Sequence, residues 1–493
     1  MQGNPSLHAN AAPYGKGLRQ TFSIGAFSII LSITMKISFS LIKPKSKDTA
    51  LVSWKKQKQS EVLLLSSGQR SIVLGVTEPE KLTRRKLVIF SRQIITLAKA
   101  NQIKKIAFKF EDLSFSKLKI SREETAELLA TNFEMANFES VKYKSKPKEG
   151  WGFIEGIIVA GNVSPGVKKA FAKGQTIGQE VNACRVLANT PGGEMTPDVL
   201  AKEAVKAARG TGVKVKVLGL REIERLKMGG VLGVAKGADE PPRFIILEYL
   251  KGGREKPIVL VGKGVTFDSG GLQIKPGEHM YEMHMDMSGG AAVIHAVVLA
   301  AKLKLKKNII GLVPAVENIP SGTAFRPGDV LKTMSGKTVE IMHTDAEGRV
   351  ILADALTYAE RYKPRLVVDV ATLTGAAVAA LGERASAIFS KDEKLINLFR
   401  DLGEISGDYV WPLPLWDEYE EDVKGTFGDI SNSSKTRYGG AINGAIFLYQ
   451  FAKIFPWVHI DMAPRMTSIE GEHLAKGAAG APVRLLIKLL ERY

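Results

Sequence analysis

Beyond residue 193, short apolar runs alternate along the chain with longer segments whose apolar positions recur at helical spacing. Apolar runs of four to six residues bounded by turn residues are typical of buried strands. The predicted strands are 213–218, 244–249, 258–261, 309–313, 366–371, 387–390 and 459–462, and the predicted helices are 196–208, 288–302, 349–362, 391–405, 441–455 and 478–491. Strands that alternate with helices indicate a mostly parallel sheet that is flanked by helices on both faces.

The preceding part of the chain has a mixed pattern that indicates a smaller α/β domain. Its predicted strands are 37–42, 51–54, 71–76 and 106–110, and its predicted helices are 80–101 and 121–138. A long helix is predicted over 166–189, because Thr190-Pro-Gly-Gly supplies a strong stop after it. We therefore predict an N-terminal α/β domain over 36–165, a linker helix over 166–192 and a larger C-terminal domain over 193–493.

Residues 1–35 form an extension before the first domain-like sequence. The extension is polar to residue 20 and mostly apolar from Thr21 to Met35. As a helix, the apolar part would be about 22 Å long, which is shorter than the ~30 Å hydrocarbon core of a bilayer. Lys16 and Arg19 resemble the charged start of a signal peptide, but no Ala-x-Ala-like site follows. We expect a disordered segment or a short apolar leader without stable membrane insertion, and Met35 is a hypothetical alternative start.

Composition narrows the class of protein. The chain has 493 residues, of which 45% are hydrophobic and 24% charged, as in soluble globular proteins with more than one core. The single cysteine, Cys184, excludes an internal disulfide and fits a reducing compartment, so we predict a cytoplasmic protein.

The net charge of +18 is unevenly distributed. Residues 1–150 hold 26 Lys and Arg against 12 Asp and Glu, whereas residues 151–493 hold 43 against 39. The basic N-terminal part is predicted to be a solvated, solubilising surface. The alternative hypothesis is weak, non-specific binding of DNA by this part of the chain.

Two glycine-rich stretches that carry acidic residues each follow an apolar run. The first is Val-Gly-Lys-Gly-Val-Thr-Phe-Asp-Ser-Gly-Gly at 261–271, which continues through Lys275 to Met-Asp-Met-Ser-Gly-Gly at 285–290, and the second is His-Thr-Asp-Ala-Glu-Gly-Arg at 343–349. Carboxylates just past strand ends lie where open α/β sheets bind their ligands. Clustered carboxylates repel each other unless cations neutralise them, so these stretches predict a metal site.

The candidate ligands are four carboxylates, Asp268, Asp286, Asp345 and Glu347. Any one of them alone would be interpreted as a surface charge or a helix cap. Together, and without a required histidine, they indicate a site for two metal ions, for which Zn, Mn, Mg and Co are all candidates.

These motifs resemble the signatures of the leucyl aminopeptidases, the cytosol aminopeptidase family of dinuclear metallopeptidases. Lys-Gly-Val-Thr-Phe-Asp-Ser-Gly-Gly and Thr-Asp-Ala-Glu-Gly-Arg occur here in the family's order, and the resemblance extends from about Val181 to the C-terminus. It implies an enzyme that releases N-terminal residues, preferably leucine or other apolar residues, from peptides by a water that two metals activate. It also implies a homohexamer, built as a dimer of trimers.

The resemblance also implies a role for individual residues. Lys263, Asp268, Asp286 and Glu347 would hold one metal, and Asp268, Asp345 and Glu347 would hold the other. Lys263 could ligate only as a neutral amine, which two adjacent dications would favour. Lys275 would stabilise the oxyanion of a tetrahedral intermediate, and Arg349 would hold a bicarbonate that serves as the general base. The positions that match the family's substrate pocket are Lys275, Met283, Thr372, Leu373, Gly375 and Ala463.

Two alternatives remain open from the sequence. A different two-metal hydrolase, such as a phosphatase, could use the same carboxylates with Lys275 and Arg349 on a phosphoryl group. A nucleic-acid-binding role could exist beside the peptidase activity, and it would survive mutation of Asp345 or Glu347. His343 stands where the family commonly has Asn, which affects the hydrogen bonds near the ligands but leaves the ligand set intact.

Overall fold

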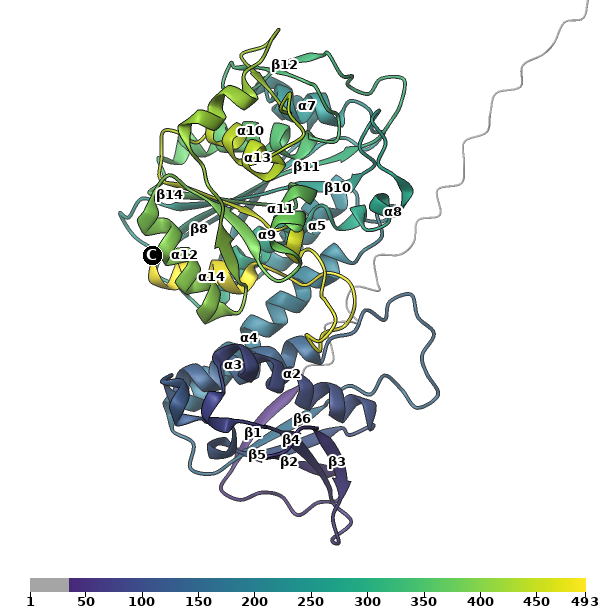
Figure 1. The fold of residues 1–493 in the computed structure, drawn as a ribbon, viewed down its shortest axis with the longest axis vertical. Coiled ribbons are helices and arrows are strands. Elements are labelled where there is room, and N and C mark those ends of the chain that lie inside the picture. The colour runs from purple at the N-terminus through teal and green to yellow at the C-terminus, as the bar shows by residue number, and fades with distance from the viewer. Residues whose placement is uncertain (1–34) are drawn as a thin grey trace, which may run out of the picture.

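The computed structural model describes residues 35–493, which fold around two separate sheets (Figure 1). Each sheet has its own hydrophobic core, and helix α4, Pro165–Ala188, runs between the two parts. The expected extension over residues 1–35 lies outside the described residues except for Met35, which is buried. The fold is therefore α/β with a smaller N-terminal and a larger C-terminal part, which confirms the predicted fold class.

The N-terminal part is a six-stranded sheet with the order β1-β6-β5-β2-β4-β3. Its strands are β1 Lys36–Ser40, β2 Thr49–Lys55, β3 Glu61–Leu64, β4 Arg70–Gly75, β5 Lys105–Lys109 and β6 Gly156–Ala160. Only β3 is antiparallel to its neighbour. Helices α2, Arg84–Ala100, and α3, Arg122–Ala136, begin where Thr83 and Ser121 accept hydrogen bonds from backbone N–H groups three residues on. The sequence had predicted neither β3 nor β6.

Helix α4 joins the two parts by packing against a helix from each. Ser164 caps its first turn with a hydrogen bond from the Val167 N–H. Along its length α4 packs against α3 of the N-terminal part and against α9, Ser288–Lys302, of the C-terminal part. A buried ion-pair network fixes the second contact, because Glu180 of α4 accepts from His295 and Lys302 of α9.

The C-terminal part is built on a nine-stranded sheet with the order β16-β15-β18-β14-β9-β11-β8-β7, in which β10 also pairs with β11. Its strands are β7 Lys214–Leu218, β8 Arg243–Leu250, β9 Ile258–Gly262, β10 Gly264–Asp268, β11 Asn308–Asn318, β14 Leu366–Ala371, β15 Ser386–Phe389, β16 Val410–Pro412 and β18 Trp457–Asp461. The central strands β9, β10, β11, β14 and β18 are parallel. A separate three-stranded sheet contains β12 Val330–Lys332, β13 Thr338–Glu340 and β17 Ile430–Ser431.

Helices cover both faces of this sheet, as the alternating pattern predicts. The core on one face includes α9 with α5 Pro197–Ala208, α12 Glu393–Ser406 and α14 Val483–Arg492. The core on the other face includes α6 Leu220–Arg225, α7 Gly229–Ala235, α10 Glu347–Ala359 and α13 Gly440–Tyr449. Among the described residues, one apolar segment, Gly277–Lys302, is long enough to span a bilayer, but 89% of its apolar window is buried, as in a core helix.

Candidate metal centre

Lys263 lies at a break between two strands that share the neighbour β11. Strand β9 pairs with the first half of β11 through Leu312, and β10 pairs with the second half from Ala315 onward. Between them, the Lys263 N–H donates to the Val370 carbonyl at 3.0 Å, and its own carbonyl accepts from the Gly290 N–H at 2.7 Å. The buried side chain of Lys263 therefore starts from a backbone that is fixed on both sides.

Glycine at position 348 makes room for the Lys263 side chain. A Cβ atom on Gly348 would lie 2.5 Å from Lys263 Cε and 2.7 Å from Nζ, closer than real Cβ contacts occur. The glycine of the Asp-Ala-Glu-Gly-Arg motif is thus required by the approach of a lysine from the other motif.

Asp268 is the last residue of β10 and is almost fully buried. Its Oδ1 accepts from the Gly270 N–H at 2.9 Å and from Asn318 Nδ2 at 2.8 Å, and its Oδ2 lies 2.8 Å from Lys275 Nζ. Gly270 has φ +87°, and a Cβ there would lie 3.1 Å from Asp345 Oδ1. The turn after Asp268 therefore needs glycine for its backbone conformation and for space.

Asp286 and Glu347 are supplied by the segments that begin two helices. Asp286 ends the short 3-10 helix η5, Met283–Met285, just before α9, and its Oδ1 accepts from Thr372 Oγ1 at 2.6 Å. Glu347 is the first residue of α10 and is fully buried. Asp286, Glu347 and Asp268 each offer a carboxylate oxygen within 4.8 Å of the others. Three predicted ligands that lie up to 79 positions apart in the sequence therefore form one cluster.

Two lysines and a fourth carboxylate complete the cluster. Lys263 Nζ lies 2.7 Å from Asp286 Oδ2 and 2.8 Å from Glu347 Oε1. Lys275 contacts both Asp268 and Asp345. Asp345 lies at the rim, with 28% of its side chain exposed. The structure thus brings together all five predicted metal ligands and Lys275.

Burial and mutual repulsion shift the ionisation of these groups. Burial raises the pKa of Asp286 and of Glu347 to about 7 and that of Asp345 to about 6, and the negative charge of Asp268 contributes to each rise. Burial by itself lowers the pKa of Lys263, but Asp286, Glu347 and Asp268 outweigh it and hold the pKa above its usual value. The two lysines therefore carry the positive charge that stabilises the carboxylates.

The residues present fit a metal ion. Among the described residues, neither oxygen of Glu347 has a hydrogen-bond donor, and Oε1 meets Lys263 only as an ion pair. Asp286 Oδ2 forms an ion pair with Lys263, and Asp345 Oδ1 forms one with Lys275, but neither contact has the geometry of a hydrogen bond. Buried carboxylate oxygens that converge without donors are the ligands that hard and borderline divalent cations take.

Arg349 lies in the first turn of α10 and is also buried. Its Nη1 donates to the Asn432 carbonyl at 2.9 Å, while its Nε has no acceptor among the described residues. Burial lowers the pKa of Arg349 to about 10, so the guanidinium remains charged at neutral pH. It can offer an unused N–H to a small anion near the cluster.

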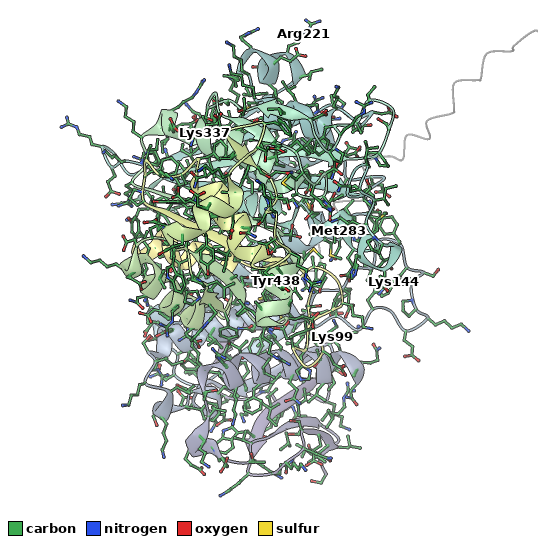
Figure 2. All side chains as sticks on the ribbon, turned by 45° about the horizontal axis from the view of Figure 1, so that its top comes forward. Lys99, Lys144, Arg221, Met283, Lys337 and Tyr438 are labelled. Carbon is green, nitrogen blue, oxygen red and sulfur yellow. The ribbon has the colours of Figure 1, made fainter. Side chains whose placement is uncertain are left out.

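The predicted substrate-pocket residues are only partly linked to the cluster. Thr372 donates to Asp286 and accepts from Lys263 Nζ through its carbonyl at 3.1 Å. The backbone N–H groups of Leu373 and Ala463 both donate to Asp461 Oδ1, at 3.1 and 3.2 Å. Gly375 begins α11, Gly375–Leu381, two residues after Leu373, and Met283, which Figure 2 labels, lies three residues before Asp286. The pocket assignment remains a prediction for these positions.

The sequence did not identify Asn318 and Asn432, two fully buried side chains that hold the cluster in place. Asn318 Nδ2 donates to Asp268 Oδ1 and, at 3.0 Å, to the Thr344 carbonyl. Asn432 Oδ1 accepts from the N–H groups of Met342 and His343, and its Nδ2 donates to the His343 and Ala346 carbonyls. Neither asparagine belongs to a motif, so no spacing in the sequence pointed to them.

Comparison with known proteins identifies one family to which this chain is similar. The model of the cytosol aminopeptidase family's catalytic domain matches residues 182–487. A probable cytosol aminopeptidase of Aromatoleum aromaticum is 45% identical over 359 residues, 72% of this chain and 70% of that protein. One of Syntrophotalea carbinolica is 49% identical over 330 residues, 66% of each chain. Among solved structures, the bottromycin maturation enzyme BotP in complex with Mn matches with a TM-score of 0.82 and 30% identity, over 90% of this chain and 99% of BotP.

Proposed function

Because this chain belongs to the cytosol aminopeptidase family and is thus a metal-dependent aminopeptidase, we propose that it removes leucine and other apolar residues from peptide N-termini at a two-metal centre. The observation that carries this proposal is the convergence of carboxylate oxygens of Asp268, Asp286 and Glu347 within 4.8 Å, with no hydrogen bond from the described residues to either oxygen of Glu347. A pair of ions, rather than one, is supported by the fourth carboxylate, Asp345, which shares Lys275 with Asp268.

We assign the ligands as the motifs suggest. Lys263, Asp268, Asp286 and Glu347 would hold one ion, Asp268, Asp345 and Glu347 would hold the other, and Asp268 and Glu347 would be shared. Mn or Zn are the proposed ions, with Mg or Co as alternatives. BotP, whose structure contains Mn, supports Mn. When bound, two such ions polarise a carbonyl and lower the pKa of a water molecule so that it is nucleophilic at neutral pH.

Lys275 is the proposed cation for developing negative charge on the substrate. Its ammonium lies between Asp268 and Asp345, and these carboxylates hold its pKa above the usual value although burial opposes them. It therefore remains protonated where an oxyanion would form. A fixed cation stabilises the oxyanion more than the neutral carbonyl, so Lys275 would raise kcat.

Arg349 is the proposed holder of a bicarbonate. The unpaired Nε and the planar guanidinium suit a small carboxylate-like anion, and Gly444 leaves space beside Nη2, because a Cβ on Gly444 would lie 3.4 Å from it. The bicarbonate would supply the general base. Asn432, which accepts from Nη1, would keep the guanidinium oriented toward it.

The preference for apolar residues follows from the proposed pocket of Met283, Thr372, Leu373, Gly375 and Ala463. The Leu373 and Ala463 segments follow the ends of the neighbouring strands β14 and β18, and Asp461 ties them together. A methyl-sized wall at Ala463 and an absent side chain at Gly375 leave room for a medium-sized apolar side chain. Leucine is the proposed best substrate.

We further propose a cytoplasmic homohexamer that acts on peptides, with its centres facing an interior cavity. The proposed domains are an N-terminal domain over 36–165, a linker helix over 166–192 and a catalytic domain over 193–493. The relatives' name, cytosol aminopeptidase, supports the location.

A single preparation tests the function. Bound metal is measured by elemental analysis, and leucyl amides, other aminoacyl amides and phosphate esters are assayed side by side. We expect close to two divalent ions per chain and hydrolysis that is fastest for leucyl and other apolar amides. Faster turnover of phosphate esters would instead support a phosphatase.

A further inference from the structure

A cavity of about 30 Å³ lies where the N-terminal and C-terminal parts meet, far in sequence from the metal-centre motifs. Helices α2 and α3 contribute Arg84 and Asn132 to its lining. The C-terminal part contributes the end of α12 and, from α14, Arg484 and Lys488. The cavity is therefore walled by charged groups from both parts of the molecule.

Most polar groups around the cavity already have partners. Arg84 donates to the Ile405 carbonyl and to Glu124. Lys488 pairs with Glu127 and Glu491. Asn132 accepts from Arg92 and donates to the Leu128 carbonyl.

Arg484 differs from these groups. Its Nη2 donates to the Gly407 carbonyl and to Asp408, but the residues that the structure describes offer no acceptor to its Nε or Nη1. The residue is only 5% exposed. Buried charged donors without acceptors are costly, so this part of the guanidinium needs an acceptor in the cavity.

The charge around the cavity has a positive excess. The groups that line the cavity or pair with its lining carry six positive and five negative charges: Arg84, Arg92, Lys173, Arg465, Arg484 and Lys488 against Glu124, Glu127, Asp408, Glu472 and Glu491. Arg92 responds to this excess, because burial and then the charge of Arg484 lower its pKa to about 9. One further negative charge would balance the cluster.

We propose that this cavity is a binding site for one small monovalent anion of about the size of chloride, held by Nε and Nη1 of Arg484. A cavity of about 30 Å³ admits one or two water-sized species, and it excludes phosphate esters, peptides and nucleotides. An anion satisfies the donors as water would, and it also cancels the positive excess where the low dielectric strengthens charge interactions. The bound anion would link α14 of the C-terminal part to α2 and α3 of the N-terminal part.

The test uses crystals and solutions of the full chain. Crystals soaked in sodium bromide should show an anomalous peak in the cavity at Arg484. In solution, replacing sodium gluconate by sodium chloride at constant ionic strength should raise Tm saturably, by about 1–2 °C at a tenfold excess of chloride over its Kd. Gluconate is too large for the cavity, so it separates binding from general salt effects.

Two variants sharpen the result. Arg484→Gln should abolish both the bromide peak and the chloride-specific rise in Tm. Arg85→Gln is the matched control, because Arg85 forms an ion pair with Glu404 across the same junction but does not line the cavity, so both signals should persist. If Arg484→Gln does not fold, the bromide peak and the chloride dependence of Tm in the unaltered chain decide whether the cavity binds an anion.

Three outcomes would overturn the proposal. Water density without a bromide peak would assign the cavity to solvent. A bromide peak without a chloride-specific change in Tm would show an adventitious ion only. An unchanged chloride dependence of Tm in Arg484→Gln would place the anion elsewhere.

Discussion

At the scale of single residues, Glu347 shows why this cluster requires cations. It is fully buried, and one lysine, Lys263, ion-pairs with it while also serving Asp286. Removing one partner of a buried pair typically costs about 3–5 kcal/mol, because the remaining charge stays in the interior. Metal ions would therefore contribute to the stability of the folded cluster as well as to its chemistry.

We predict that Asp268→Ala and Glu347→Ala each lose bound metal and peptidase activity together, since both are assigned as shared ligands. Metal content by elemental analysis and leucyl-amide hydrolysis are measured on the same samples. Glu360→Ala, an exposed glutamate just beyond α10, is the control and should keep both. Full activity in Asp268→Ala would refute the ligand assignment.

Lys275→Ala should keep the metal and lose kcat by about 10²–10³, the usual effect of removing an oxyanion donor. Because Lys275 is assigned to the transition state rather than to the ions, KM should change much less than kcat. Steady-state kinetics with parallel metal analysis distinguishes the two roles. A parallel fall of metal content and rate would make Lys275 a structural counter-ion of Asp268 and Asp345.

Asn432→Ala should weaken metal binding although Asn432 is not a ligand. The side chain makes four hydrogen bonds to the backbone of residues 342–346, the loop that carries Asp345 and leads to Glu347. Loss of such supporting contacts typically costs about 10–100-fold in metal affinity or activity. Activity should recover at higher metal concentration, which a general loss of stability would not produce. The exposed Asn397→Ala is the control.

These residues also show what the sequence could predict at this scale. The glycine-rich motifs keep their ligands close in the chain, so Asp268, Asp345 and Glu347 could be recognised from local spacing alone. Asn318 lies 50 positions from Asp268, and Asn432 lies 87 positions from Asp345. Their roles arise from strand pairing and loop docking, which local spacing does not encode.

At the scale of elements, buried strands and amphipathic helices of the C-terminal part were predicted well, because short apolar runs specify the strands and apolar positions at helical spacing specify the helices. The sequence did not predict that β9 and β10 are separated at Lys263, nor that β13, ahead of the second motif, belongs to a separate small sheet. Both depend on pairing partners, β11 and β17, that are distant in sequence. The glycine-rich segment at 228–237 contains the short helix α7, which the sequence had not predicted.

Helix α3 carries a buried glutamate, Glu134, and a partly buried one, Glu127, with opposite electrostatic environments. Burial raises the pKa of Glu134 to about 7, opposed by the hydrogen bond from Gln175. Burial also acts on Glu127, but Lys488 and Lys173 outweigh it and hold its pKa below the usual value. The raised folded-state pKa of Glu134 costs stability as pH rises from about 4.5 to 7. The lowered pKa of Glu127 contributes stability, which is lost as pH falls through its folded-state pKa.

Replacing each of these glutamates by glutamine therefore gives a matched pair of tests. Glu134→Gln should raise Tm at pH 8 by several degrees and leave it nearly unchanged at pH 4.5, since the glutamate is already neutral there. Glu127→Gln should lower Tm at pH 8, because it leaves Lys488 and Lys173 without this partner. Thermal unfolding across pH 4.5–8 measures both. An equal effect of Glu134→Gln at all pH values would contradict the burial argument.

At the scale of the whole molecule, the junction between the two parts uses some of the basic residues that the sequence had left unassigned. Arg84 donates to the Ile405 carbonyl and to Glu124, and Arg85 pairs with Glu404, so this run joins the two parts. By contrast, Lys144, Lys146 and Lys148 are exposed, and Figure 2 shows Lys144 on a segment that projects from the molecule. Charge from sequence alone could not separate these two uses.

The hypothesis of weak DNA binding can therefore be tested on the exposed run rather than on the junction. Changing Lys144, Lys146 and Lys148 together to Glu should reduce retention of duplex DNA at about 50 mM salt. The change should spare peptidase activity, because the residues assigned to it all lie beyond 260. Retention by the unaltered chain should fall steeply as salt rises, because binding releases counterions. The matched control for net charge is a second triple variant, in which Lys251, Arg254 and Lys256 are all changed to Glu. These three residues are exposed on the C-terminal part. If both triple variants lose retention equally, net charge alone explains it. If the unaltered chain does not bind at this salt, the basic surface serves only solubility.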